Sequence, residues 1–127
     1  MANAEVRESK ICAGTDHPLG LFAAGKLAKD VVIAQFEFPL DRTQAEVEFE
    51  GYRHDSGVFL GKGFVWDHGF TSGRTPLWWR MNHQPAKLAN VKLVNGAHNT
   101  PTWRTLRKVA IDEELTYDYG DVPSEWA

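Results

Sequence analysis

The chain has 127 residues, a length typical of one domain, and 43% of them are hydrophobic, including 5 Trp and 7 Phe. This composition excludes a disordered chain, and we expect a single domain over residues 1–127 with one hydrophobic core. The 14 Lys and Arg against 17 Asp and Glu give a formal charge of −3, which argues against direct binding to nucleic acid and favours a basic partner.

The N-terminal segment contains the single cysteine of the sequence, Cys12. One cysteine cannot form an intramolecular disulfide or a cysteine-based zinc site, so we expect a reducing compartment. Glu5, Arg7, Glu8 and Lys10 interrupt any apolar run there, and we expect a soluble intracellular protein with no membrane partner. The 5 histidines show no paired ligand spacing, so the sequence predicts no metal site.

The predicted secondary structure is mainly β, because 11 Gly and 6 Pro divide the chain into short apolar runs. β-Branched and aromatic residues fill several of these runs. A short helix is predicted around Leu77–Asn82, and Ala23–Lys29 could form a helical turn, although Gly25 disfavours it. In chain order, the expected strands are Glu5–Cys12, Val31–Phe38, Ala45–Phe49, Val58–Leu60, Phe64–Trp66, Val91–Val94 and Thr102–Val109.

Three separated segments point to a function when they are taken together. They are Leu19–Ala23 with the following Lys29–Asp30 and Val31–Ile33, then Met81–His83, and finally Ile111–Gly120, which reads Ile-Asp-Glu-Glu-Leu-Thr-Tyr-Asp-Tyr-Gly. In order and spacing, over about residues 14–120, they resemble the SET-domain family of protein lysine methyltransferases. The resemblance implies a mainly β, β-clip fold of several short sheets with a short helix and a knot-like C-terminal segment.

The first two segments resemble the parts of this family that bind S-adenosyl-L-methionine. By this resemblance the glycine-containing loop at Leu19, Gly20 and Leu21 lies along the cofactor, where a glycine lets the backbone approach a ligand closely. Asn82 then holds the ammonium or carboxylate end of the cofactor, and His83 contacts the adenine largely through its backbone. Taken alone, Gly20 could simply turn one strand into the next, and Asn82 could cap a helix beside a surface histidine.

The chain departs from the family pattern in three places. Pro18 stands where a second glycine is usual, and Trp79 stands where an arginine is usual. Gln84–Asn90 replaces the usual Ser-Cys-x-Pro-Asn, with Asn90 as a substitute for the final asparagine. These departures favour an alternative function, a catalytically silent peptide-binding module on the same fold.

The third segment contains the predicted catalytic residue, Tyr119. Methyl transfer from a sulfonium to an amine requires alignment, exclusion of water and a neutral amine. The unperturbed pKa of lysine is about 10.4, and an aromatic channel favours the neutral form by desolvation. By resemblance the Tyr119 hydroxyl orients the amine and faces the methyl group, while Tyr117 lines the channel and favours mono- or dimethylation. The alternative is a plain edge strand with alternating aromatic residues.

The tail residue Trp126 either folds back over the adenine or the lysine channel or belongs to a frayed terminus. An acidic cluster could attract a cationic peptide, although a solvated acidic surface also explains it. This cluster consists of Asp112, Glu113, Glu114, Asp118 and Asp121.

The resemblance implies a basic protein or peptide substrate, such as a histone tail, and hence the nucleus of a eukaryotic cell or host. For a member of the family this short, a homodimer is one assembly that the resemblance allows. A third interpretation is a β-rich interaction or carbohydrate-binding domain with exposed Trp78, Trp79 and Trp103 as its contact surface.

Overall fold

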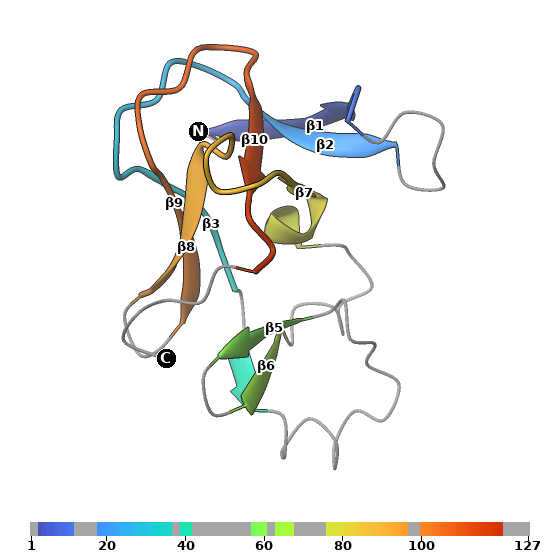
Figure 1. The fold of residues 1–127 in the computed structure, drawn as a ribbon, viewed down its shortest axis with the longest axis vertical. Helices are drawn as coiled ribbons and strands as arrows, with labels where there is room; N and C mark the ends of the chain where they lie inside the picture. The colour runs from blue at the N-terminus through green and yellow to red at the C-terminus, as the bar shows by residue number, and fades with distance from the viewer. Residues whose placement is uncertain are drawn as a thin grey trace.

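The computed structural model of the protein describes residues 3–11, 18–36, 39–41, 57–60, 63–67, 76–96 and 100–120. These residues form a mainly β structure with three small sheets and one short 3-10 helix, η3 (Leu77–Arg80) (Figure 1). The first sheet contains, in spatial order, β1 (Ala4–Glu8), β2 (Leu19–Ala23), β10 (Glu114–Tyr117) and β7 (Asn82–His83). This sheet brings together segments that are far apart in the sequence.

The last strand among the described residues, β10, occupies an inner position in the first sheet. It pairs antiparallel with β2 through Glu114 opposite Phe22 and Leu115 opposite Leu21. On its other side it runs parallel to β7, with Thr116 opposite Asn82. On its other edge β2 pairs with β1 along its whole length, so β2 has partners on both edges.

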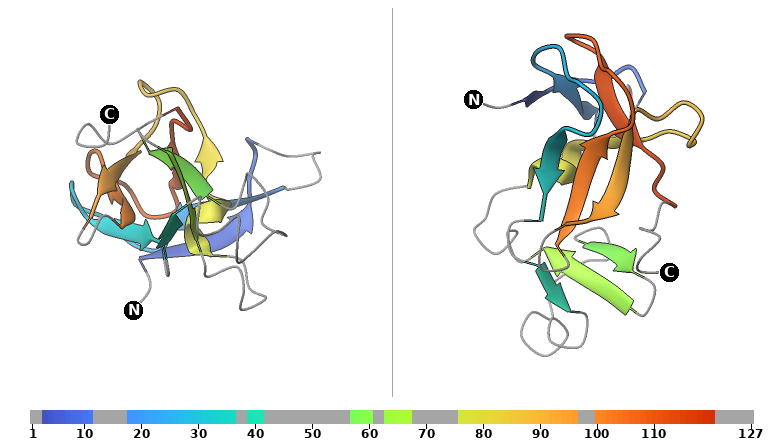
Figure 2. Two further views of the ribbon diagram at one scale, coloured as in Figure 1. Left: turned by 90° about the horizontal axis from the view of Figure 1, so that it is seen from below. Right: turned by 90° about the vertical axis from the view of Figure 1, so that its left-hand side faces the viewer.

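The other two sheets each have three antiparallel strands. One contains β3 (Val32–Gln35), β9 (Pro101–Thr105) and β8 (Val91–Asn95), in that order. The other contains β4 (Pro39–Asp41), β6 (Gly63–Asp67) and β5 (Gly57–Leu60). Figure 2 shows that the β3-β9-β8 sheet lies between β1 and β2 at one end and β4, β5 and β6 at the other.

The hydrophobic core lies between the first and second sheets and is rich in stacked aromatic rings. Trp78 and Trp103 are nearly parallel, with ring centroids 5.1 Å apart and an interplanar angle of 5°. Phe36 stacks on Trp78 with centroids 5.0 Å apart. Stacked aromatic pairs of this kind add to the stabilisation that comes from burial alone.

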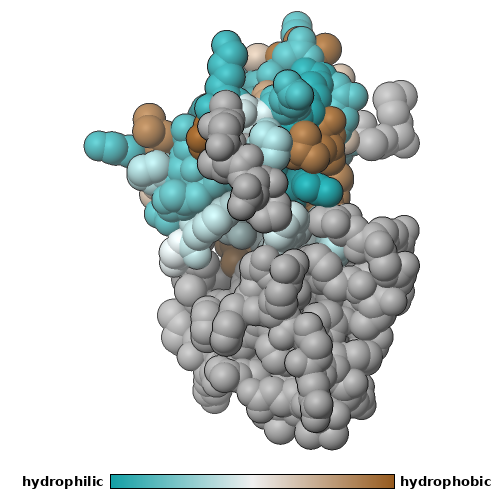
Figure 3. Space-filling model, turned by 90° about the vertical axis from the view of Figure 1, so that its right-hand side faces the viewer, coloured by the Kyte–Doolittle hydropathy of each residue, from teal (hydrophilic) through white to brown (hydrophobic). Residues whose placement is uncertain are grey.

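The proposed tryptophan contact surface is wrong. Trp78 is 3% exposed and Trp103 is fully buried, and the partly buried Trp79 packs against the same core. The physical reason is that both fully enclosed rings stack with Phe36 inside the molecule. Figure 3 shows mostly polar side chains over the described part of one face, with hydrophobic groups in small patches between them.

Several predicted elements are confirmed, with changes at their ends. Strands occur within or around the predicted segments at β1, β3, β5, β6, β8 and β9, and β9 ends at Thr105 where the prediction continued to Val109. The predicted helix at Leu77–Asn82 is the 3-10 helix η3, and β7 follows it. Ala45–Phe49 lies outside the described residues.

Two predictions for the N-terminal third are wrong. Leu19–Ala23 was expected as a loop and is the strand β2, because it has pairing partners on both edges. No helical turn forms in Ala23–Lys29, where Leu27 instead makes an isolated bridge with Val109. Within the described part of the chain, no helix has the length and apolarity needed to cross a membrane.

Candidate active site

The Asn82 side chain connects the three segments that the sequence singled out. Its Nδ2 atom donates to the Leu19 carbonyl oxygen at 3.2 Å and to Oε2 of Glu114 at 2.9 Å. These partners lie on β2 and β10, and Asn82 itself begins β7. Asn82 therefore does not cap a helix, and it joins three neighbouring segments of one sheet.

Gly20 lies directly beside the side chains of Asn82 and Glu114, which we call the polar cluster. A Cβ atom on Gly20 would be 2.5 Å from Oε2 of Glu114 and 2.9 Å from Nδ2 of Asn82, which is closer than real contacts allow. Ser9 completes the cluster, because its Oγ atom lies 2.7 Å and 2.8 Å from the two Glu114 carboxylate oxygens. The glycine is thus needed for the approach of the protein's own side chains and does not turn one strand into the next.

The two neighbours of Gly20 have different environments. Leu21 is fully buried and belongs to the hydrophobic core, so its side chain has a packing role. Leu19 is half-buried, and its carbonyl oxygen faces Asn82. Leu19 and Gly20 therefore lie beside the polar cluster, whereas Leu21 points its side chain to the core.

Tyr119 lies just after the end of β10. It is held by His83, in β7, and by Met81, the residue that precedes β7. Its hydroxyl donates to the carbonyl oxygen of Met81 at 2.7 Å, and its backbone N–H donates to Nδ1 of His83 at 3.0 Å. The ring also contacts the His83 imidazole, with centroids 5.1 Å apart. Tyr119 as a whole is nevertheless 56% exposed, whereas the hydrogen bond of its hydroxyl is partly buried.

Tyr117 is close to Tyr119 but is buried. It is 6% exposed, and its ring meets Trp103 edge-on with centroids 5.6 Å apart. The Tyr117 and Tyr119 rings are 5.0 Å apart and tilted by 48°. The two tyrosines thus form an aromatic wall that runs from the core to the surface, and Tyr117 lies in a paired inner strand, not in an edge strand.

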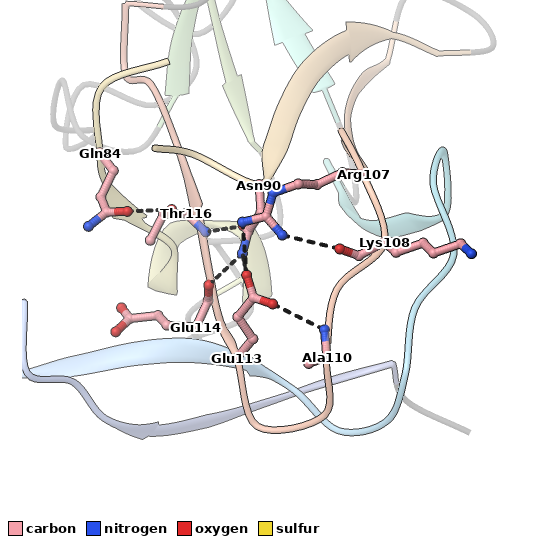
Figure 4. A network of polar contacts seen from close by, with 8 residues as sticks. All are labelled: Gln84, Asn90, Arg107, Lys108, Ala110, Glu113, Glu114 and Thr116. Carbon is pink, nitrogen blue, oxygen red and sulfur yellow. Dashed lines mark hydrogen bonds and ion pairs between the residues drawn. The ribbon is translucent and has the colours of Figure 1, made fainter. Parts of the chain in front are cut away.

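Asn90 also holds β10, through the hydrogen bonds that Figure 4 shows. It is 2% exposed, and its Oδ1 atom accepts the Thr116 N–H at 2.9 Å. Its Nδ2 atom donates to the Glu114 carbonyl at 2.8 Å and to Oε2 of Glu113 at 2.9 Å. Asn90 therefore uses its whole amide to fix the strand that precedes both tyrosines.

Glu113 is held by three hydrogen-bond donors, as Figure 4 shows. Burial by itself raises the pKa of this carboxyl group, but hydrogen bonds from Asn90, the Ala110 N–H and Arg107, with the positive charge of Arg107, lower the pKa below its usual value. The carboxylate is therefore the preferred form in the folded protein.

Sequence reasoning missed the structural roles of Ser9 and Glu114 and left Asn90 as a substitute without a stated contact. Nothing in the strand pattern marks Ser9, because its partner Glu114 is 105 residues away. The sequence did contain a signal for Glu114. It is the second of two adjacent glutamates and comes directly before Leu115, and a carboxylate at the start of a buried strand needs hydrogen-bond donors. Trp126 and the histidines other than His83 lie outside the described residues.

Among the described residues, no group of three or more His, Cys, Asp or Glu side chains could hold a metal ion. No protein-family model matches the chain, and no curated protein matches it.

Proposed function

We propose that the protein is an S-adenosyl-L-methionine-dependent protein-lysine N-methyltransferase with a SET-domain, β-clip fold. The observation that carries this proposal is the position of β10 between β2 and β7. This order places Gly20, Asn82 and Tyr119, one from each segment that resembles the family, around a single sheet. The entry of a C-terminal strand between two earlier strands also agrees with a knot-like C-terminal segment.

The polar cluster at Gly20 fits the ammonium end of the cofactor better than its carboxylate end. Both hydrogens of the Asn82 amide are used for Leu19 and Glu114, so neither is left to donate to a carboxylate. The Leu19 carbonyl and the Glu114 carboxylate are acceptors as well. When bound, the cofactor supplies an electrophilic methyl group on a sulfonium, and in this proposal the backbone at His83 lies against the adenine.

Tyr119 is suited to orient the amine of the substrate. Because its hydroxyl donates to the Met81 carbonyl, its oxygen meets other groups as a hydrogen-bond acceptor. An acceptor attracts the N–H groups of an amine and an electron-poor methyl group, which aligns them for in-line displacement. The fixed hydroxyl requires no reorganisation when the reaction occurs.

The aromatic wall of Tyr117 and Tyr119 would exclude water from the lysine side chain. A lysine that loses water contacts is less stable as an ammonium, so its proton passes to solvent more readily and the neutral amine needed for attack becomes accessible. The Tyr117 hydroxyl, in this proposal, limits the space for added methyl groups and favours mono- or dimethylation.

A basic protein or peptide, such as a histone tail, is the proposed substrate class. The Asp118 side chain lies between the two tyrosines in sequence and is 30% exposed, which places a negative charge near the proposed entrance for lysine. Action on a histone would place the protein in the nucleus of a eukaryotic cell or host, and a homodimer would be one way to extend the substrate surface.

The second candidate function is a catalytically silent peptide-binding module on the same fold. It is favoured by the bonds within the polar cluster, because Ser9 and Asn82 already satisfy the Glu114 carboxylate without a ligand. Calorimetry with S-adenosyl-L-methionine, followed by transfer of a labelled methyl group to core histones and mapping of the modified residue, separates the two. Methylated lysine supports the enzyme, and peptide binding without transfer supports the silent module.

A further inference from the structure

The backbone of Tyr119 is held by a side chain and not by the sheet. β10 ends at Tyr117, two residues before Tyr119, so the strand ladder does not fix the Tyr119 peptide. Its N–H group donates to Nδ1 of His83, 3.0 Å away. The His83 ring also contacts the Tyr119 ring, and the two ring planes are tilted by 57°.

We propose that His83 is a positioning residue for Tyr119 and that it acts only as the neutral imidazole. This inference rests on the proposed function for its catalytic consequence. A neutral imidazole offers one acceptor nitrogen, and here that nitrogen is Nδ1, so the proton must be on Nε2. An imidazolium has two N–H groups and no acceptor, so protonation removes the bond that holds the Tyr119 backbone.

A second partner is in place for the protonated form of His83. Oδ1 of Asp118 lies 3.8 Å from Nδ1 of His83 and also accepts the Gly120 N–H at 2.9 Å. Within the described chain, this is the one ion pair that His83 makes; the other titratable groups that face it are Tyr119 and its register partner Tyr117. Protonation therefore exchanges the Tyr119 N–H for the Asp118 carboxylate as the partner of Nδ1.

Loss of this bond affects the hydroxyl as well, because the two residues that hold Tyr119 are separated by a single residue in sequence. Met81 holds the hydroxyl and His83 holds the backbone, with Asn82 between them. Loss of the backbone contact removes one of these two hydrogen bonds, and small misplacements of a reacting group reduce rates strongly. Activity is expected to fall when His83 gains a proton.

The test compares the wild-type protein with His83→Asn and His83→Leu. The side-chain oxygen of asparagine can replace Nδ1 as an acceptor and does not titrate in this range, whereas leucine has no acceptor. At pH 9 we expect kcat to fall about tenfold or more in His83→Leu and to be largely restored in His83→Asn. The cofactor Kd, measured by calorimetry, should stay within about twofold because the proposed cofactor contact of His83 uses its backbone.

Ionisation of the substrate lysine changes the rates of the wild-type protein and of His83→Asn equally. Its effect therefore cancels in the ratio of the two rates. We expect this ratio to fall as the pH is lowered from 9, because only the wild-type protein has an imidazole to protonate at this position. A ratio that does not change with pH, or a His83→Leu protein with wild-type kcat at pH 9, would overturn the proposal.

A structural measurement separates this inference from the proposed function. In ¹H–¹⁵N spectra, the Tyr119 amide of the wild-type protein should titrate together with the His83 ring, and it should stay constant over the same pH range in His83→Asn. If no methyl transfer is found but this titration is seen, the enzyme assignment fails and the contact stands. If the chemical shift of the Tyr119 amide changes neither with pH nor on substitution of His83, then His83 does not position Tyr119.

Discussion

The carbonyl oxygen of Met81 accepts the hydroxyl hydrogen of Tyr119 across 2.7 Å, and this bond ties the end of the C-terminal segment to the residue before Asn82. Met81 is itself 1% exposed and belongs to the core. The position of the Tyr119 hydroxyl is therefore set by a buried residue, although the Tyr119 ring is mostly accessible.

Asn90→Ala should destabilise the fold. The change leaves the Thr116 N–H and the Glu114 carbonyl without their side-chain partner inside the protein, and we expect a loss of about 3 kcal/mol in the free energy of unfolding. Urea denaturation followed by circular dichroism measures it. Lys87→Ala, on the exposed turn before Asn90, is the control and should change the stability by less than about 0.5 kcal/mol. Equal stability of the two variants would refute the role of Asn90.

Gly20→Ala and Gly25→Ala form a matched pair. A methyl group at Gly20 would collide with the Glu114 carboxylate and the Asn82 amide, and we expect a loss of about 1–3 kcal/mol. A methyl group at Gly25 meets no heavy atom within 4 Å, so Gly25→Ala should be neutral or stabilise by up to about 1 kcal/mol. Thermal unfolding of both variants checks this, and a Gly20→Ala protein as stable as Gly25→Ala would contradict the close packing at Gly20.

Glu113 should contribute to stability at neutral pH and lose this contribution in acid. Its pKa is lower in the folded protein than in the unfolded chain, so the unfolded state binds the proton more readily and stability falls as the pH decreases. The difference between the wild-type protein and Glu113→Gln should be full above about pH 5.5 and should shrink as the pH falls below the unfolded pKa of about 4.3.

Urea titrations at a series of pH values measure this difference for Glu113. Glu8→Gln is the control, because Glu8 is an exposed carboxylate at the end of β1. A difference for Glu113→Gln that stays constant from pH 7 to pH 3 would show that the carboxylate is not preferentially stabilised by folding.

Local sequence patterns predicted the elements whose partners are close in the chain. β8 and β9 pair from Val91 opposite Thr105 to Asn95 opposite Pro101, and their β-branched residues suit such a pair. The pair β5 and β6 is another example, since only two residues separate its strands. In these cases, turn residues and strand propensity act on the same short segment, so one window of sequence contains the whole signal.

The elements with distant partners could not be predicted in this way. Leu19–Ala23 contains a glycine and has a strand conformation only because β1 and β10 pair with it, and β10 begins more than 90 residues later. The same holds for Asn90, whose function depends on backbone groups of β10. For the site, the sequence predicted Asn82 and Tyr119 as important residues, but it could not show that Met81 and His83 hold Tyr119 or that Ser9 joins Glu114.

Tyr117→Phe should raise the final methylation state of the product. The substitution keeps the ring that packs against Trp103 and Tyr119, so the fold should be retained. It removes the hydroxyl that, in the proposed mechanism, restricts the space for a methylated amine. Mass spectrometry of the product peptide at equal extents of reaction would show more trimethylated lysine than the wild-type protein gives. An unchanged distribution of mono-, di- and trimethylated product would remove Tyr117 from that role.

Methyl transfer by the wild-type protein and by Tyr119→Phe is the most direct measurement of the central claim. The assay uses labelled S-adenosyl-L-methionine and a histone-tail peptide, with circular dichroism to confirm that both proteins are folded. Because the lost hydroxyl belongs to a half-accessible ring, we expect the fold to persist and the rate to decrease by about a hundredfold or more. A Tyr119→Phe protein that transfers methyl groups to lysine at the wild-type rate would contradict the mechanism, and a folded wild-type protein that transfers none would contradict the function.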